Sequence, residues 1–288
     1  MRIVVNEKNE LVLKNKLKIA IQGVLGSFHH QVAQQYFGAD CEPVGYHTFE
    51  EVAKSVENGM VDYAVMAIEN SIAGAILPNY DIIDRHHLYV VDEHYLPISH
   101  NLMALPGQQL ADIREARSHP MALLQCKQFF SQHPAIRTVD DVDTAYVAKI
   151  IAEQQQKGLA AVASIKAAEY YGLEILAKDI QTVANNFTRF IILQKKQPVR
   201  EASPSKASLK ITIRNEKGAL AKLLTLMSAY DLDLTKIQSI PVMSKPWEYT
   251  FFIDTLIADE TKFEEALDLI EKKYGTVKLL GAYQNRKG

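Results

Sequence analysis

The sequence predicts an α/β protein in two parts, and three observations carry that prediction. Between residues 18 and 193, short apolar runs alternate with polar turns and amphipathic segments, the rhythm of strands and helices in α/β lobes. A polar, proline-bearing stretch over residues 194–206 then interrupts the pattern, as a linker does. Beyond it, six predicted elements follow in the order βαββαβ.

Composition excludes several classes of function. The chain has 288 residues, of which 48% are hydrophobic and 23% charged, as is usual for a globular protein. The net charge of −2 gives no electrostatic reason to expect nucleic acid or an anionic membrane as a partner. No apolar run reaches bilayer length, and no signal-peptide core opens the chain. Cys41 and Cys126 have no metal-binding spacing, so we expect a reduced, cytoplasmic protein.

The first predicted strands lead into polar turns. Residues 18–23 form a buried strand that enters a glycine turn, where Ser27 is placed to cap a helix ending at Gly38. Thr48 and Glu51 have the spacing of a capping box and predict a second helix. The strand over residues 61–68 delivers Glu69, Asn70 and Ser71 at its carboxyl end, where open α/β sheets bind ligands. The same residues with Gly74 also make an ordinary turn.

The middle of the chain continues the α/β pattern. Two strands are predicted over residues 87–95 and 98–105, and Ser118-His119-Pro120 opens a helix with apolar residues at 122, 126 and 129. Asp143 caps a further helix that ends at Gly158. A strand over 159–163, a helix over 165–171 and a strand over 173–180 follow, and the repeated order predicts parallel sheets.

The segment Asn185-Asn186-Phe187-Thr188-Arg189-Phe190 is the strongest candidate for a working site. It is predicted as a polar loop that feeds the buried strand 191–193. Arg189 offers a planar set of donors suited to a carboxylate, and Thr188 offers one mobile proton donor. Taken alone, the segment is more typical of a turn with an N-cap threonine and a surface arginine, and the other motifs of the chain are what favour a site.

The C-terminal part has its own pattern. Its predicted elements are a strand over residues 209–214, a helix over 220–227, strands over 234–242 and 249–257, a helix over 263–270 and a strand over 277–283. That order is the ferredoxin-like arrangement. We therefore divide the chain into an N-terminal extension (1–17), to which we assign no function, a main domain (18–195), a linker (196–206) and a C-terminal domain (207–284).

Five motifs, in order, resemble the monofunctional prephenate dehydratases that carry a C-terminal ACT regulatory domain. The resemblance covers residues 18–284, and extension 1–17 is too short for the chorismate mutase domain that some members carry in front. The motifs are Gly23-x-x-Gly26-Ser27-Phe28, Ile68-Glu69-Asn70-Ser71 with Gly74, Ser118-His119-Pro120 with Ala122-Leu123 and Gln125-Cys126, Asp143-Thr144-Ala145, and Asn186-x-Thr188-Arg189-Phe190.

The resemblance implies a fold and a reaction. The fold is a catalytic domain of two α/β lobes, like a type II periplasmic binding protein with a cleft between them, followed by the ACT domain. The reaction converts prephenate to phenylpyruvate with loss of carbon dioxide and water, and it needs no cofactor and no metal. Thr188 matches the family's essential threonine and would donate to the departing hydroxyl oxygen. The candidate substrate-binding residues are Arg189, Asn186, Phe190, Glu69, Asn70, Ser71, Ser118 and Thr144.

The resemblance also implies feedback control. In ACT dimers, loops bind phenylalanine between subunits, so we expect phenylalanine as an allosteric effector and a homodimer or homotetramer. The expected effector-binding residues are Gly218, Ala219, Leu220, Asp233, Leu234 and Ser239, with a turn at Asp233-Leu234-Thr235. Two motifs depart from the family pattern, at three positions in all. Lys217 replaces a proline, and Gln238-Ser239-Ile240-Pro241 replaces Glu-Ser-Arg-Pro.

Two alternatives stay open at this point. The same elimination could act on arogenate, in which an amino group replaces the keto oxygen. The chain could instead be a non-catalytic amino-acid sensor built from binding-protein lobes. An intact proton donor beside an anion-binding arginine favours the enzyme, because a sensor has no use for the donor.

Overall fold

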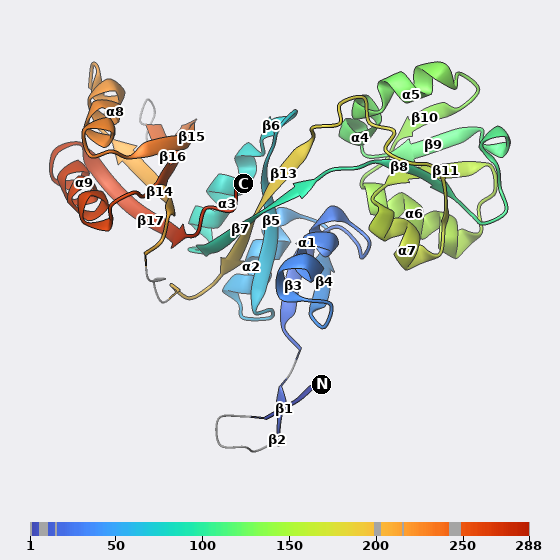
Figure 1. Ribbon diagram of the computed structural model, residues 1–288, viewed down its shortest axis with the longest axis horizontal. Coiled ribbons are helices and arrows are strands. Elements are labelled where there is room, and N and C mark those ends of the chain that lie inside the picture. Colours follow the sequence, from blue (N-terminus) through green and yellow to red (C-terminus); the bar gives the residue numbers. More distant parts are fainter. Residues whose placement is uncertain are drawn as a thin grey trace. The chain divides into compact units, whose positions relative to one another are not determined.

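The structure is a computed structural model, and it describes residues 2–5, 11–14, 16–198, 203–214, 216–241 and 249–287 (Figure 1). Residues 199–202 of the predicted linker and Val242 of a predicted strand lie outside the described residues. Contacts divide the chain into two compact units. The first comprises residues 1–76 and 94–190, and the second comprises residues 77–93 and 191–288. At the N-terminus, β1 (Arg2–Val5) pairs antiparallel with β2 (Leu11–Lys14).

The first lobe is built on a sheet with the strand order β4-β3-β5-β13-β7. Its strands are β3 (Lys18–Gln22), β4 (Glu42–Tyr46), β5 (Tyr63–Asn70), β7 (Tyr89–Pro97) and β13 (Phe187–Gln194), with short β6 (Gly74–Ala75) paired to β5. Strand β3 runs parallel to both β4 and β5, as predicted. The helices α1 (Phe28–Phe37) and α2 (Phe49–Glu57) connect these parallel strands.

Local capping signals in this lobe are confirmed. The Ser27 hydroxyl accepts a hydrogen bond from the His30 amide at the start of α1. At α2, Thr48 accepts from the Glu51 amide, and the Glu51 carboxylate accepts from the Thr48 amide, which completes the predicted capping box. These caps fix where each helix begins, so the residues just before α1 and α2 lie at the carboxyl ends of the strands.

The second lobe carries a sheet with the order β10-β9-β11-β8-β12. Its strands are β8 (Asn101–Ala104), β9 (Glu115–Ser118), β10 (Arg137–Asp140), β11 (Leu159–Ala163) and β12 (Glu174–Ala177). The prediction of a parallel sheet is confirmed for β9, which runs parallel to both β10 and β11. It was wrong for β8, which runs antiparallel to both β11 and β12. The chain enters β8 directly from the other lobe, with no helix to reverse its direction.

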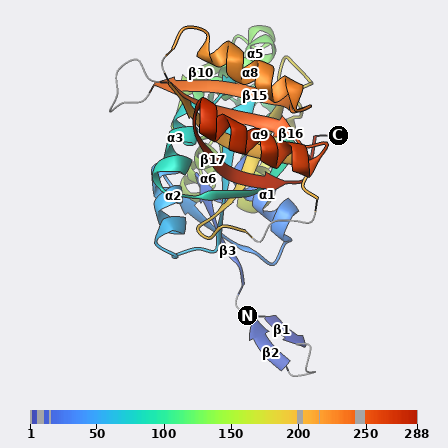
Figure 2. The same ribbon diagram turned by 90° about the vertical axis from the view of Figure 1, so that its left-hand side faces the viewer.

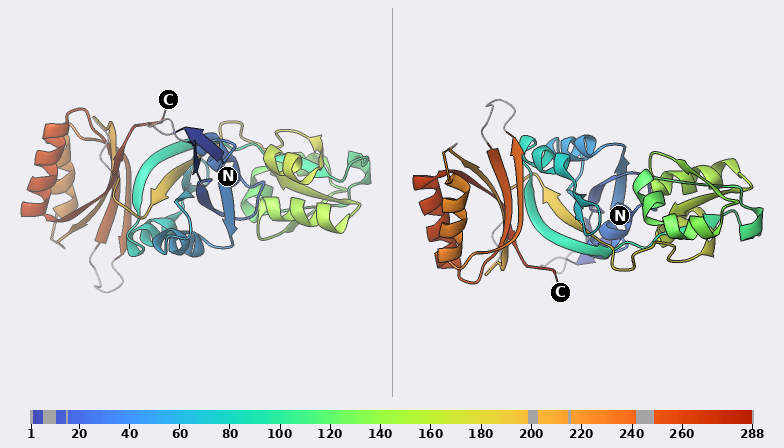
Figure 3. Two further views of the ribbon diagram at one scale, coloured as in Figure 1. Left: turned by 90° about the horizontal axis from the view of Figure 1, so that it is seen from below. Right: turned by 90° about the horizontal axis from the view of Figure 1, so that it is seen from above.

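Helices cover both faces of this second sheet (Figures 1 and 3). Leu102 and Ala104 of β8 pack with α4 (Pro120–Gln125) and α5 (Lys127–Gln132), whereas Met103 packs with α6 (Thr144–Gln154) and α7 (Ile165–Tyr171). The two faces follow from the alternation of side chains along a strand. A single helix was predicted after Pro120, but Cys126 separates two short ones. A short 3-10 helix, η1 (Leu110–Asp112), precedes β9.

The second unit contains the predicted βαββαβ order. Its elements are β14 (Lys206–Ile213), α8 (Ala219–Ala229), β15 (Asp233–Pro241), β16 (Tyr249–Leu256), α9 (Glu260–Lys273) and β17 (Gly275–Tyr283). The antiparallel sheet has the order β15-β16-β14-β17, and α8 and α9 lie on the same face of it (Figures 2 and 3). The predicted turn at Asp233-Leu234-Thr235 is instead the start of β15.

This unit also includes α3 (Leu77–Arg85), which was not predicted, and the first residues of β7. The buried ammonium of Lys206 lies 2.8 and 3.0 Å from the two carboxylate oxygens of Glu93. The Asp84 carboxylate pairs with Lys210 and Lys278, which hold its pKa below the usual value against the opposing effect of burial. Removing either partner of the buried pair would leave an uncompensated charge, so we expect these contacts to hold residues 77–93 on the sheet.

Candidate active site

A cavity of about 380 Å³ lies within the first unit, where residues of both lobes meet. Its walls come from the ends of β3 and β5, the starts of α1, α2 and α6, helix α4, the segment that joins β7 to β8, and β13. Of the residues predicted from sequence, four line it, namely Asn70, Thr144, Thr188 and Phe190. The carboxyl ends of strands and the starts of helices are where α/β proteins bind ligands.

Strand β13 places consecutive residues on opposite faces. The predicted loop over residues 185–190 is wrong in part, because the strand begins at Phe187 and includes Thr188 and Arg189. Thr188 and Phe190 both line the cavity, as residues two apart on a strand do. Arg189 lies between them and is not among the cavity residues. Its side chain is 3% exposed, and its guanidinium donates to a Glu69 oxygen 3.1 Å away.

The side chain of Asn70, at the end of β5, links this strand by hydrogen bonds to Asn186 and to Thr188 of β13. Its Oδ1 accepts from the backbone amides of Ile72 at 3.0 Å and Ala73 at 2.8 Å. Its Nδ2 donates to Asn186 Oδ1 at 2.7 Å and to Thr188 Oγ1 at 3.0 Å, with the Phe187 carbonyl a longer acceptor at 3.2 Å. Backbone amides can only donate, so they fix which end of the Asn70 carboxamide faces the strand. Since Asn70 donates to Thr188, the threonine's own proton is left to donate elsewhere.

The chain of hydrogen bonds continues into the second lobe. Because Asn186 Oδ1 accepts from Asn70, its Nδ2 is the end that faces Gln125, and it donates to Gln125 Oε1 at 3.0 Å. The same Gln125 oxygen lies 2.9 Å from Nε2 of His100. Asn186 is 1% exposed. It therefore acts behind the cavity wall, where it aligns Asn70 and Gln125.

One wall of the cavity is aromatic and uncharged. His29 packs edge-on against Phe190, with the ring centres 5.0 Å apart, and it also contacts Phe49. Its Nε2 accepts from the Ala67 amide at 3.3 Å. Burial lowers the pKa of His29 to about 3, so the ring is neutral at physiological pH.

The starts of two helices face the cavity. Ser27 caps α1, and Asp143 caps α6 by accepting from the Tyr146 amide at 2.9 Å. Burial raises the pKa of Asp143 above its ordinary value, although its helix amides oppose the shift. Gly23 has a φ of +89°, and a Cβ there would come within 3.1 Å of Asp143 Oδ2. Glycine therefore allows the two lobes to approach at this point.

Two other predicted residues, Ser71 and Ser118, lie outside the cavity and form hydrogen bonds with the backbone of neighbouring strands. Ser71 Oγ accepts from the Phe187 amide at 2.9 Å, and the Ser71 amide donates to the Phe187 carbonyl at 2.8 Å. Ser118 is fully buried, and its hydroxyl donates to the Val162 carbonyl at 2.6 Å. The structure thus places both side chains in contacts with the backbone and not on the cavity surface.

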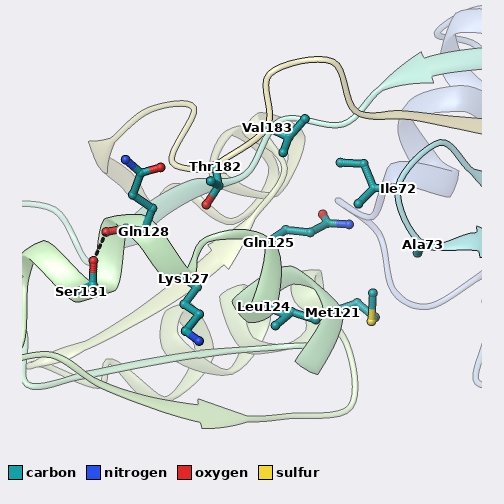
Figure 4. Close-up of a pocket in the computed structure, with 10 residues that line it drawn as sticks. All are labelled: Ile72, Ala73, Met121, Leu124, Gln125, Lys127, Gln128, Ser131, Thr182 and Val183. Atoms are coloured by element: carbon teal, nitrogen blue, oxygen red, sulfur yellow. Dashed lines mark hydrogen bonds between the residues drawn. The ribbon is translucent and has the colours of Figure 1, made fainter.

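A second opening of about 660 Å³ adjoins the first and shares Ala73, Met121 and Gln125 with it. Figure 4 shows its lining, which is apolar at Ile72, Leu124 and Val183 and polar near Ser131, whose hydroxyl donates to the Gln128 carbonyl at 2.7 Å. Gln125 stands at the boundary between the two openings.

Sequence reasoning gave no role to several of these residues. Gln125 stood inside a motif, and that was the available signal for it. Asp143 was predicted as a helix cap and stood in the motif Asp143-Thr144-Ala145, but it was given no role in the site. His29 and His100 lie in none of the five motifs, so neither carried a signal.

The second unit has a cavity of its own, of about 400 Å³. The predicted effector-binding residues Gly218, Ala219, Leu220 and Ser239 line it, together with Tyr249 and Phe251 of β16. Asp233 and Leu234, also predicted, are not among its lining residues. Gly218 has a φ of +77° and stands directly before α8.

The fold and the site define a class: a protein with mixed α/β lobes and a polar, hydrogen-bonded cavity where they meet. The family profile described as Prephenate dehydratase matches residues 19–198, well over half of the chain. The chain belongs to the prephenate dehydratase family and is an enzyme, a lyase. No helix in the described part of the chain is long and apolar enough to span a membrane.

Curated relatives agree with the family assignment. The chain is 34% identical to arogenate dehydratase/prephenate dehydratase 1, chloroplastic, of Arabidopsis thaliana, over 93% of this chain and 72% of that protein. It is 32% identical to the bifunctional chorismate mutase/prephenate dehydratase of Aquifex aeolicus, over 95% of this chain and 75% of that protein.

Solved structures share the fold. Prephenate dehydratase from Arthrobacter aurescens, in complex with L-Phe, matches with a TM-score of 0.84 and 27% identity over 93% of this chain and 90% of that one. A protein described as a novel type of quorum quenching acylase, GqqA, matches with a TM-score of 0.86 and 28% identity over 94% and 98% of the two chains.

Proposed function

We propose that this chain is a prephenate dehydratase of phenylalanine biosynthesis that converts prephenate to phenylpyruvate in the cavity lined by Thr188. The observation that carries the proposal is the hydrogen bond from Asn70 Nδ2 to Thr188 Oγ1 at 3.0 Å. It fills a lone pair of the hydroxyl and leaves its proton for a substrate. Hydroxide is a poor leaving group, and a donor at its oxygen lowers the barrier to its departure.

Beyond a hydrogen-bond donor at the departing oxygen, the reaction needs few catalytic groups from the protein. The bond to the ring carboxylate breaks, its electrons form the aromatic ring, and the C4–O bond breaks as the oxygen takes up a proton to leave as water. Thr188 is a very weak acid, so it serves as a hydrogen-bond donor to the departing oxygen, and solvent supplies the net proton. Aromatisation drives the elimination, so positioning and hydrogen bonding suffice.

The position of Arg189 agrees with this chemistry. The ring carboxylate leaves as neutral carbon dioxide, so its negative charge decreases in the transition state. A cation paired with it would stabilise the substrate more than the transition state and would slow the reaction. Arg189 is instead paired with Glu69 on the other face of β13, where we propose that it braces the strand. The starts of α1 and α6, with Thr144, are our candidates for holding the pyruvyl carboxylate, which keeps its charge.

Substrate preference tests the proposal against its close alternative, arogenate. The cavity offers neutral His29 and the amide of Gln125, which suit a keto oxygen better than an ammonium group. We therefore expect kcat/KM to be at least about tenfold higher for prephenate than for arogenate, a difference of about 1.4 kcal/mol. The ratio of the two kcat/KM values is measured with purified protein, as phenylpyruvate formed from prephenate and phenylalanine formed from arogenate. A ratio of one or less assigns the chain as an arogenate dehydratase, and binding without turnover supports the sensor.

We further propose that residues 207–284 form an ACT domain, joined through linker 196–206 to a monofunctional catalytic domain over 18–195. The cavity at the start of α8 fits a phenylalanine, since helix amides suit its carboxylate and Phe251 its ring. The relative from Arthrobacter aurescens, solved with L-Phe, supports phenylalanine as the effector. A cytoplasmic homodimer or homotetramer completes the proposal.

Phenylalanine should inhibit the enzyme, and Gly218→Val should weaken that inhibition. Valine is strained at a φ of +77°, so the loop that presents the helix amides would rearrange. We expect the phenylalanine concentration for half-inhibition to rise about tenfold or more, measured by phenylpyruvate formation. Thr225→Val on the exposed face of the same helix is the control and should leave inhibition unchanged. Equal inhibition of the native protein and the Gly218→Val variant would refute this location of the site.

A further inference from the structure

His100 lies on the segment that joins the two lobes, between β7 and β8. Its side chain is 2% exposed and packs edge-on against Phe28, with ring centres 5.7 Å apart. Its backbone is held on both sides: the amide donates to Gln181 Oε1 at 2.8 Å, and the carbonyl accepts from the Ile180 amide at 2.8 Å. The imidazole is therefore a rigid group at the wall of the cavity.

The position of the imidazole proton follows from the hydrogen bonds around it. Gln125 Oε1 can only accept, and the chain of donors that begins at the Ile72 and Ala73 amides fixes this oxygen as the atom facing His100. Nε2 of His100 must then carry the proton. Burial lowers the pKa of His100, so the ring is neutral and its Nδ1 bears a lone pair.

Nδ1 of His100 is buried and has no hydrogen-bond partner among the described residues. A buried acceptor without a partner costs stability, and an apolar ring of similar size would avoid that cost. A purely structural role, which only fills space beside Phe28, does not account for a histidine here. The hydrogen bond from Nε2 to Gln125 does.

We propose that His100 is a positioning residue, which holds the Gln125 carboxamide so that its NH₂ group faces the substrate. The proposal rests on the proposed dehydratase function. Two donors, His100 Nε2 and Asn186 Nδ2, converge on Gln125 Oε1 at 2.9 and 3.0 Å. With the oxygen held from two sides, the Nε2 donors of Gln125 remain for a substrate oxygen. In Figure 4 the amide end of Gln125 points toward Ile72 of the second opening.

The geometry predicts which side chain can take over the hydrogen bond from His100 to Gln125. Glutamine can place an N–H close to the position of the imidazole Nε2, whereas asparagine is shorter and reaches only the position of Nδ1. We expect His100→Gln to keep kcat/KM for prephenate within about threefold of the native value, and His100→Asn to lower it about tenfold or more. The two variants are matched in chemistry and differ in reach. Equal losses in both would overturn the proposal.

A double-mutant cycle with Gln125→Ala tests whether His100 acts through Gln125. If it does, His100→Asn should change kcat/KM less than about twofold in the Gln125→Ala background. An undiminished loss in that background would contradict the proposal. Thermal unfolding of each variant shows that the comparison is made between folded proteins.

A spectroscopic measurement on the native protein tests the proposal without depending on enzyme activity. Nitrogen NMR of protein labelled with ¹⁵N-histidine distinguishes the two neutral tautomers, and His100→Gln identifies the signal. We expect the neutral Nε2–H tautomer of His100 at about pH 7 to 8, which lies above the ordinary histidine pKa of about 6.5. The Nδ1–H tautomer would refute the proposed direction of the hydrogen bond to Gln125, even if prephenate turnover is normal. Absence of turnover with the expected tautomer would instead contradict the proposed function.

Discussion

Asn70→Asp is expected to lower kcat for prephenate about 100-fold or more, although aspartate has almost the same shape as asparagine. One carboxylate oxygen of Asp at this position would still accept from the Ile72 and Ala73 amides. The other would face Asn186 Oδ1 and Thr188 Oγ1, two oxygens that now receive hydrogen bonds from Nδ2. The Thr188 proton would turn toward the new carboxylate, and the cavity would lose its donor.

Comparison with Asn70→Ala distinguishes a reversed hydrogen bond to Thr188 from the simple loss of that hydrogen bond. Alanine removes the donor but leaves no acceptor to capture the Thr188 proton, so we expect Asn70→Ala to retain a higher kcat than Asn70→Asp. Asn58→Asp, at the exposed end of α2, is the control for the added charge and should behave as the native protein. If Asn70→Asp turns over prephenate at the native rate, the deduced direction of these hydrogen bonds is wrong.

The elements that could be predicted from the sequence are those set by local interactions. Ser27, Asp143 and the pair Thr48 and Glu51 cap helices in the structure as predicted, because a cap involves residues only three positions apart. Continuous apolar runs such as Leu159–Ala163 were equally clear, since both faces of that strand are buried. The βαββαβ order of the C-terminal part was predicted from the spacing of its apolar residues along each helix and strand.

Other elements had weak local signals. Strand β4 contains a proline and a glycine, which are uncommon within strands, and its pairing with β3 is what makes it extended. Strands β9 and β10 have four residues each, too few to show a period. The antiparallel direction of β8 depends on where the chain crosses between lobes, which no local pattern records.

The candidate site was predictable as a set of residues but not as an arrangement. Asn70, Thr144, Thr188 and Phe190 were named from sequence and line one cavity. The separation of Arg189 from Thr188 depends on the strand beginning at Phe187, a boundary that patterns locate poorly. The contact between Asn70 and Asn186 joins residues 116 positions apart, and that between Gln125 and Asn186 spans 61, so both arise only from the tertiary fold.

The proposed reaction depends most on the hydroxyl of Thr188, and Thr188→Val removes this group with little change in the shape of the side chain. Valine keeps the branched side chain of the strand residue but cannot donate to the departing oxygen. Asn70 Nδ2 would still donate to Asn186 Oδ1 and to the Phe187 carbonyl, so the surrounding frame should persist. The loss of a donor at a poor leaving group should reduce kcat by about 100-fold to 10,000-fold.

The most direct test measures phenylpyruvate formed from prephenate by the native protein, Thr188→Val and Thr188→Ser under identical conditions. We expect one phenylpyruvate for each prephenate consumed by the native protein, at most about 1% of the native rate with valine, and a rate within about tenfold of native with serine. Turnover by the valine variant at the native rate would contradict the role of Thr188. A native protein that binds prephenate and returns it unchanged would contradict the assignment as a dehydratase.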